Sequence, residues 1–256
     1  MSHRRSGIGA VLVGTLYGFY GWAVFAACAL FALVAVLVVP GEARRHRFAA
    51  GASRAIFILG GVAPVVRGRE NLPAGNAVVV ANHASYADGP LLKGYLPARF
   101  SFVIKGEMRR IPIAHFLLRR SGSEFVERHE KHGSSRDARR IVKAAVDGGS
   151  LAFFPEGTFR PEPGVGRFRA GAFVAAVRGA MPVVPVAISG TRRMMPSGRS
   201  WPWPVRPRID ILPPIRPGDP AFADHRTLAE TVRQRIIAVL GEPDLCTVNG
   251  PDSRAC

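Results

Sequence analysis

An apolar segment without any charged residue runs from Ile8 to Val39, and its second half, from Ala23 onward, is almost entirely aliphatic. As a helix, the aliphatic half measures about 25 Å, just enough to cross the hydrocarbon core of a bilayer. Aromatic residues cluster before it, as they do at membrane interfaces. The pattern predicts a membrane-attached helical segment: a span, a tilted span, or an interfacial hairpin broken near Gly18 and Gly21.

Beyond residue 65 the pattern changes to short apolar runs that alternate with longer amphipathic stretches. The apolar runs have the length and the β-branched content of buried strands, whereas the amphipathic stretches have helical periodicity. Such alternation predicts an α/β fold with a mixed, largely parallel sheet flanked by helices. Strands are expected at residues 77–81, 100–104, 124–127, 151–154, 183–188 and 208–212, and helices at residues 90–96, 113–120, 135–147, 170–178 and 225–240.

These changes of pattern divide the chain into three parts. Residues 1–64 form the N-terminal membrane-attachment segment, in which residues 48–62 lie along the membrane surface or pack on the following domain. Residues 65–241 form the α/β domain. Residues 242–256 have little periodicity and are expected to be a disordered tail.

Three shorter patterns each have two interpretations. Gly14 and Gly18 have the spacing of small residues in paired membrane helices, but a single match is weak evidence. Residues 111–118 are more apolar than a surface helix should be, so they form either a core-facing helix or a membrane-contacting wall of an acyl-chain channel. The sequence Trp-Pro-Trp-Pro at residues 201–204 is either an interfacial aromatic anchor or a plain proline-rich loop.

Polar residues follow the first strand of the α/β domain, in the sequence Asn-His-Ala-Ser-Tyr-Ala-Asp-Gly at residues 82–89. On a continuous helix His83 and Asp88 would point about 140° apart, so they can meet only across a turn. A histidine oriented by a carboxylate is a standard general base. In the alternative interpretation Asp88 is only the N-cap of the next helix and His83 only a turn residue.

A second polar stretch, Phe-Pro-Glu-Gly-Thr-Phe-Arg at residues 154–160, also follows a predicted strand. The two motifs, Asn-His-x-Ser-x-x-Asp and Phe-Pro-Glu-Gly-Thr-x-Arg in this order, resemble those of the glycerolipid acyltransferase family, whose best-known members acylate 1-acylglycerol-3-phosphate. The resemblance extends from residue 66 to 215. It includes weaker blocks at residues 103–112, 168–172 and 183–188, the second with arginine where the family has lysine.

The resemblance implies a role for each motif residue. His83 would be the general base, held by Asp88, and Arg160 would bind the phosphate of the acceptor. Lys105 is a second candidate for the phosphate and Arg128 a third. The remaining residues assigned to substrate binding are Asn82, Ser85, Glu156, Gly157 and Thr158, with Glu156 placing hydroxyl or glycerol groups. Ser85 is not needed as a nucleophile, because the acceptor hydroxyl can attack the thioester directly.

Charge and cysteine content narrow the class of partner. Lysine and arginine number 35 against 18 acidic residues, a formal charge of +17, which implies anionic lipids, acidic substrates, carrier proteins or nucleic acid. The basic residues form scattered pairs without interleaved aromatics, which argues against nucleic acid. The three cysteines suggest neither a metal site nor a disulfide framework, so a reducing, cytoplasm-facing location fits best. Four arginines within residues 44–54 favour the same orientation.

The expected function is therefore that of a membrane-associated O-acyltransferase of phospholipid biosynthesis. It would move a fatty acyl group from acyl-CoA or acyl carrier protein to the free hydroxyl of 1-acylglycerol-3-phosphate, giving phosphatidate. The expected partners are membrane lipids, the lysophospholipid acceptor and the donor, with no further cofactor, metal or nucleic acid. The expected location is the inner, cytoplasmic membrane, with the catalytic domain facing the cytoplasm.

Two alternatives stay open. One is an acyltransferase of the same family acting on another lysolipid, such as lyso-ornithine lipid. The other is a membrane-tethered basic binding protein without activity, which would explain the charge and the apolar segment but not the ordered motifs.

Overall fold

The computed structural model describes residues 3–126 and 140–248, and in this part of the chain seven strands form one sheet. They are β1 (Val65–Arg67), β2 (Val78–Ala81), β3 (Phe100–Lys105), β4 (Glu124–Val126), β5 (Ser150–Phe153), β6 (Val183–Ser189) and β7 (Arg208–Ile211). Their order across the sheet is β1-β7-β6-β2-β5-β3-β4. Neighbours pair in parallel except β6 and β7, so β1 and β7 run against the other five. The predicted mixed, largely parallel sheet is confirmed.

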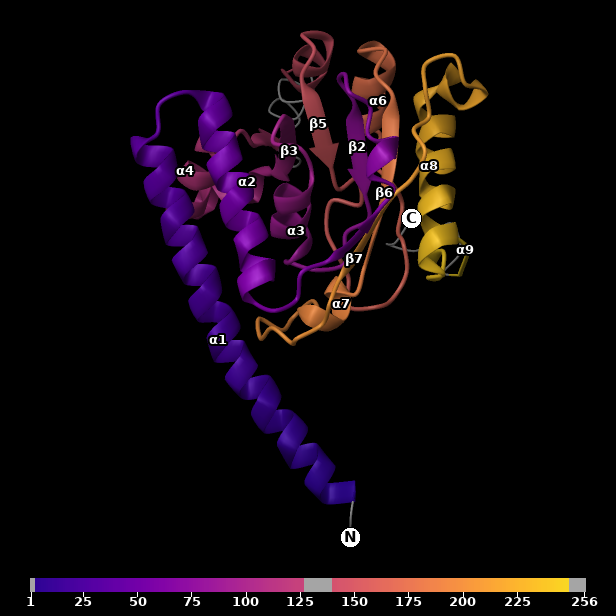
Figure 1. Ribbon diagram of the computed structural model, residues 1–256. Helices are drawn as coiled ribbons and strands as arrows, with labels where there is room; N and C mark the ends of the chain where they lie inside the picture. The colour runs from indigo at the N-terminus through magenta and orange to yellow at the C-terminus, as the bar shows by residue number, and fades with distance from the viewer. Residues whose placement is uncertain (1–2, 127–139, 249–256) are drawn as a thin grey trace.

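Helices lie on both faces of this sheet (Figure 1). On one face are α2 (Glu42–Leu59) and α3 (Asp88–Tyr95), with α1 (His3–Val38) and α4 (Pro112–Arg120) packed against α2. On the other face are α6 (Gly171–Arg178), α8 (His225–Leu240) and the helical residues 140–146. The short helices α7 (Thr191–Met194) and α9 (Leu245–Val248) and three 3₁₀ turns, Arg69–Asn71, Gly106–Arg110 and Pro220–Ala223, complete the described elements.

The sheet separates two apolar cores because successive side chains of a strand point to opposite faces. In the fully buried β2, Val79 and Ala81 belong to the core under α2 and α3, whereas Val78 and Val80 belong to the core under α6 and α8. Burial on both faces explains why this strand is a continuous apolar run in the sequence. The polar residues that follow such a strand therefore begin where it leaves the core.

Most predicted elements are confirmed, with small differences at their ends. The helix predicted at residues 225–240 has these bounds in the structure: the Asp224 carboxylate accepts the N–H groups of Arg226 and Thr227, and Gly241 ends the helix at φ 64°. The strand β1 was not predicted, because three residues at a sheet edge carry almost no periodic signal. The first part of the helix predicted at residues 135–147 lies outside the described residues.

The N-terminal helix α1 is continuous, so of the three alternatives for this segment the hairpin broken near Gly18 and Gly21 is wrong. Helical hydrogen bonding tolerates isolated glycines at a modest cost. Residues 12–38 are long and apolar enough to cross a membrane by length and composition. The helix also contacts the rest of the protein along its length: Trp201 Nε1 donates to the carbonyl of Gly14, and the Arg120 guanidinium donates to that of Val36.

The spaced glycines of α1 accommodate two indole rings. A Cβ on Gly18 would lie 2.0 Å from the ring of Trp201, and a Cβ on Gly14 would lie 2.5 Å from the ring of Trp203. The small residues therefore allow the Trp-Pro-Trp-Pro segment to pack on α1, and within the described chain they pair with no second helix. The segment is thus part of the contact between α1 and the α/β domain.

The second N-terminal helix, α2, packs on the α/β domain. This is one of the two arrangements predicted for residues 48–62. Ala49, Ala52 and Phe57 are buried, and a Cβ on Gly94 of α3 would lie 2.7 Å from the backbone nitrogen of Arg54. Glycine at this position lets the two helices approach closely, as small residues do at helix contacts.

The beginning of the predicted tail is ordered, so the prediction of disorder is wrong for residues 242–248. Asp244 forms a parallel bridge with Val165, and its carboxylate accepts two hydrogen bonds, of 2.6 and 2.8 Å, from the buried guanidinium of Arg233. Leu245 is buried. These contacts are with residues distant in the sequence, so local periodicity could not reveal them.

Candidate active site

Both motifs of the sequence lie at the carboxyl edge of the central strands. The strand β2 pairs in parallel with β5 and with β6, so the loops that follow these three strands are neighbours. The chain continues from β2 to α3 on one face and from β5 to α6 on the other. The loops therefore diverge at this point, where α/β proteins commonly form a binding crevice.

The buried carboxylate of Asp88 organises the first motif. Its Oδ2 accepts three hydrogen bonds: from Nδ1 of His83 at 3.0 Å, from the backbone N–H of Ala84 at 2.7 Å and from that of Ser85 at 2.8 Å. Asp88 is the first residue of α3, and Ala87 occupies the N-cap position. The N-cap interpretation of Asp88 is therefore wrong, and the histidine and the carboxylate meet across a turn, as predicted.

The ring of His83 is held between two aromatic side chains. Phe154 stacks on it at a centroid distance of 4.5 Å, and Phe159 meets it edge-on at 4.7 Å. An ionised carboxylate only accepts hydrogen bonds, so Nδ1 carries the proton toward Asp88. Nε2 is then the nitrogen that can accept a proton, and the imidazole has the orientation of a general base.

Glu156 of the second motif supports the first. Its Oε1 accepts the backbone N–H of His83 at 2.8 Å, and its Oε2 accepts that of Gly166 at 3.0 Å. Burial, the largest cause, raises the pKa of the Glu156 carboxyl to about 7, although the two N–H groups act in the opposite direction. Each oxygen thus holds a loop, and the role of Glu156 in positioning substrate hydroxyl groups stays a prediction.

Asn82 and Ser85 also have architectural roles. The Asn82 amide donates to the carbonyl of Ile188 at 3.0 Å and accepts its N–H at 2.7 Å, as a strand neighbour would. The Ser85 hydroxyl donates to the carbonyl of Met195 at 2.7 Å and accepts the N–H of Ala87 at 3.1 Å. Both residues are buried. These bonds hold the turn and the strand end in place, and substrate binding by the two residues stays a prediction.

The structure gives less detail on the contacts of the other predicted binding residues. Gly157 has a φ of 77° and closes a turn onto the carbonyl of Phe154, as a turn glycine does. Thr158 is exposed and Arg160 is partly buried in the same loop. Lys105 ends β3 at the same edge of the sheet; of this residue only the backbone is described. Arg128 lies outside the described residues.

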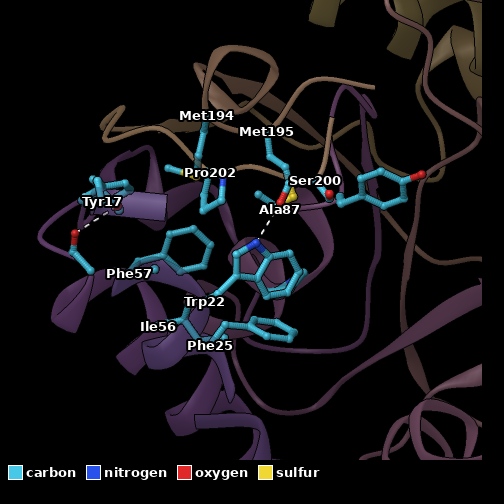
Figure 2. A pocket seen from close by; sticks show the side chains of 15 residues that line it. Tyr17, Trp22, Phe25, Ile56, Phe57, Ala87, Met194, Met195, Ser200 and Pro202 are labelled. Carbon is cyan, nitrogen blue, oxygen red and sulfur yellow. Dashed lines mark hydrogen bonds between the residues drawn. The ribbon is translucent and has the colours of Figure 1, made fainter. Parts of the chain in front are cut away.

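An apolar pocket of about 380 Å³ lies beside the turn of the first motif (Figure 2). The N-terminal helices line it with aromatic and aliphatic side chains, and Trp22 Nε1 donates to the carbonyl of Ser200 on the opposite wall at 2.9 Å. Residues from four segments form the lining: Tyr17, Gly21, Trp22 and Phe25 of α1; Ile56 and Phe57 of α2, with Gly60 and Val62 after it; Tyr86, Ala87 and Pro90; and Met194, Met195, Ser200 and Pro202.

Sequence reasoning missed the aromatic residues around His83 and the source of the pocket wall. Phe154 and Phe159 lie within the second motif, but nothing in their local pattern shows that they contact a residue about seventy positions earlier. The helix α4, expected as a possible channel wall, is not in the lining of this pocket. Ile111, which precedes the helix, and Ile113 and Phe116 within it instead expose apolar surface.

Among the described residues, no group of three or more histidine, cysteine, aspartate or glutamate side chains could hold a metal ion.

Comparison with known proteins places this arrangement in a family. The family described as "Acyltransferase" matches residues 63–189, which include both motifs. The crystal structure of the 1-acyl-sn-glycerophosphate acyltransferase PlsC from Thermotoga maritima superposes with a TM-score of 0.73 and 27% identity, over 91% of this chain and 95% of that one. Residues 63–189 of this chain form an acyltransferase domain.

Curated relatives of this acyltransferase chain differ in their acceptors. A chloroplastic 1-acyl-sn-glycerol-3-phosphate acyltransferase of Arabidopsis thaliana is 32% identical over 165 residues, 64% of this chain and 46% of its own length. A lyso-ornithine lipid O-acyltransferase of Pseudomonas aeruginosa is 34% identical over 122 residues, 47% of this chain and 46% of its own length. The chain thus spans about half the length of these relatives.

The raised pKa of Glu156 predicts a pH-dependent effect of replacing it. Because the pKa rises from 4.5 to about 7, the folded protein holds a proton that the unfolded chain has released between these pH values. The associated stability is fully present below about pH 4.5 and is lost as the pH rises to about 7. Glu156→Gln does not titrate, so relative to wild type its free energy of unfolding should rise by about 2–3 kcal/mol between pH 5 and pH 8.

Urea unfolding at the two pH values measures this difference. At pH 5 the glutamine variant should be the less stable protein, because its amide can accept only one of the two N–H groups. A stability difference that is the same at pH 5 and pH 8 would contradict the prediction.

Proposed function

We propose that this chain is a membrane-attached O-acyltransferase that moves a fatty acyl group from acyl-CoA or acyl carrier protein to the free hydroxyl of 1-acylglycerol-3-phosphate. The observation that carries the proposal is the 3.0 Å pair of His83 and Asp88 beside an apolar pocket. A base next to a space for an aliphatic chain is what transfer of an acyl group to a lipid hydroxyl requires.

In the proposed reaction, His83 Nε2 removes the proton of the acceptor hydroxyl while its oxygen attacks the thioester carbonyl carbon. Asp88 stabilises the imidazolium that forms. The tetrahedral intermediate collapses with cleavage of the C–S bond, and the imidazolium returns the proton to the thiolate. The products are the new ester and a free thiol, so no external oxidant, reductant or metal enters the balance.

The acceptor is proposed from the names of the relatives and from Arg160. A guanidinium binds phosphate with charge-assisted hydrogen bonds, and Arg160 lies in the loop that Glu156 ties to His83. The relative from Pseudomonas aeruginosa favours lyso-ornithine lipid as the second candidate. A basic tether without activity is disfavoured, because it would need no buried carboxylate behind a histidine.

Membrane attachment is proposed from the surface of α1. Leu12, Leu16, Leu30, Leu37 and Val38 are each more than half exposed, and an apolar surface of this kind marks a membrane or protein contact. Contacts with the catalytic domain at both Gly14 and Val36 favour a helix that lies against the bilayer beside the domain over one that crosses it perpendicularly. The catalytic domain would face the cytoplasm, at the inner membrane.

The proposed chemistry predicts a folded but nearly inactive Asp88→Asn variant. An asparagine oxygen can accept the same three bonds, but the side chain has no charge to stabilise the imidazolium, so turnover should fall on the order of 10²–10³-fold. Its amino group would replace the buried Oδ1, which has no hydrogen-bond partner among the described residues. An unsatisfied donor there should cost about 1–3 kcal/mol of stability.

The assay pairs purified protein with acyl-CoA and acyl carrier protein donors and with lysophosphatidate and lyso-ornithine lipid acceptors. Asp210→Asn is the matched control, because Asp210 is also buried but lies on β7 and pairs with Arg208. If the wild type acylates only lyso-ornithine lipid, that lipid replaces 1-acylglycerol-3-phosphate as the proposed acceptor. Near-normal turnover by Asp88→Asn would exclude the His83–Asp88 pair from the mechanism.

The phosphate assignment predicts a selective effect of Arg160→Ala. Loss of a charge-assisted contact costs about 1.5–3 kcal/mol, so kcat/KM for lysophosphatidate should fall roughly ten- to a hundredfold. The KM for the donor should change little. Arg216→Ala removes an equal charge from an exposed position after β7 and serves as the control. Unchanged acceptor kinetics in Arg160→Ala would exclude the residue from the site.

The apolar face of α1 predicts that the protein sediments with membranes and needs detergent for extraction. Screening by 1 M salt weakens electrostatic attraction to lipid headgroups, but it leaves apolar insertion intact. Release into the soluble fraction by salt alone would show that the basic surface, and not α1, holds the protein at the membrane.

A further inference from the structure

The loop that carries the second motif is long and needs support from outside. Residues 154–170, all of them described, join β5 to α6 and form no helix or strand of their own. Loops of this length without secondary structure are uncommon in compact domains and are usually functional. Arg160 lies in the middle of this loop, so its position depends on what holds the backbone around it.

Arg192 of α7 holds this part of the loop. Its Nη1 donates to the carbonyls of Arg160 and Glu162, both at 2.8 Å. Its Nη2 forms an ion pair of 3.1 Å with Oε2 of Glu242, and the side chain is 15% exposed. One planar guanidinium thus fixes two carbonyl groups and a carboxylate, which an ammonium on a flexible stem cannot do with the same geometry.

Glu242 supports the loop from the C-terminal side. Its Oε2 accepts the N–H of Gly164 at 2.9 Å as well as the bond from Arg192. The neighbouring backbone continues this contact, since Val165 donates to the carbonyl of Pro243 at 3.0 Å. The segment is in turn attached to α8 through the pair of Asp244 and Arg233 described above.

We propose that Arg192 and Glu242 are positioning residues for the acceptor: they hold the loop around Arg160 in the geometry that binds the phosphate, without touching it themselves. The inference rests on the proposed function. Ordering a loop before binding removes a cost that the ligand would otherwise have to meet. The guanidinium of Arg192 is already engaged with the loop and with Glu242, so its effect on the acceptor passes through Arg160.

The proposal predicts that Arg192→Met raises the KM for lysophosphatidate on the order of ten- to a hundredfold, the range expected when a binding group is misplaced. The kcat and the KM for the donor should change less than about threefold, since His83 is held by Asp88 and Glu156. Arg192→Lys should recover only part of the loss, and Glu242→Gln, which keeps an acceptor for Gly164, should be intermediate. Arg235→Met, an exposed arginine on α8, is the charge-matched control.

A double variant tests whether the effect passes through Arg160. In an Arg160→Ala background, Arg192→Met should add less than about threefold to the acceptor KM, because the group it positions is already gone. If the fold-changes in acceptor KM of the two single variants multiply in the double variant, Arg192 acts on the acceptor independently of Arg160, and the positioning role is overturned.

Hydrogen exchange in the unliganded protein separates this inference from the proposed function. The amides of Gly164 and Gly166 should exchange at least tenfold faster in Arg192→Met than in wild type, while those of β2 stay unchanged. Inactivity of the wild type toward lysophosphatidate would refute the proposed acceptor. It would then also refute the inference that Arg192 and Glu242 position the loop for a phosphate. Unchanged exchange, or an unchanged acceptor KM in an active enzyme, would refute the inference alone.

Discussion

The site depends on one oxygen atom, Oδ2 of Asp88, which accepts three N–H groups in a fully buried position. A buried carboxylate is stable only when hydrogen bonds replace its hydration. The turn at residues 83–85 supplies two of these bonds from its backbone and the third from the imidazole of His83. The carboxylate, which needs these bonds, therefore shapes the turn, orients the imidazole and leaves Nε2 as the nitrogen that faces away from Asp88.

Around this atom, most polar side chains of the two motifs connect loops to one another through hydrogen bonds. Asn82 ties the end of β2 to β6, Ser85 ties the turn to the segment after α7, and Glu156 ties His83 to Gly166. Each of these side chains bonds to backbone groups that would otherwise be unsatisfied at the edge of the sheet. A residue pattern that marks a catalytic family can thus record the construction of the site as much as its chemistry.

Local patterns in the sequence were sufficient for the elements whose signals are local. The helix of residues 225–240 has its cap and its glycine stop nearby, and β2 is buried on both faces, so both were predicted. The pairing of His83 with Asp88 followed from spacing and a turn. The role of Glu156 and the order of residues 242–248 depend on partners such as Gly166 and Arg233, which are distant in sequence and whose contacts only the folded chain creates.

The packing of Trp201 and Trp203 on the glycines of α1 has a consequence for how the protein is made. The ribosome synthesises α1 before the aromatic residues that pack on it, which follow almost two hundred residues later. During that interval the apolar helix lacks the partners on which it packs, and exposed apolar surface of this kind is prone to aggregation. The apolar pocket, which needs residues of α1 and of the segment 194–202, can therefore form only after that later segment has been synthesised.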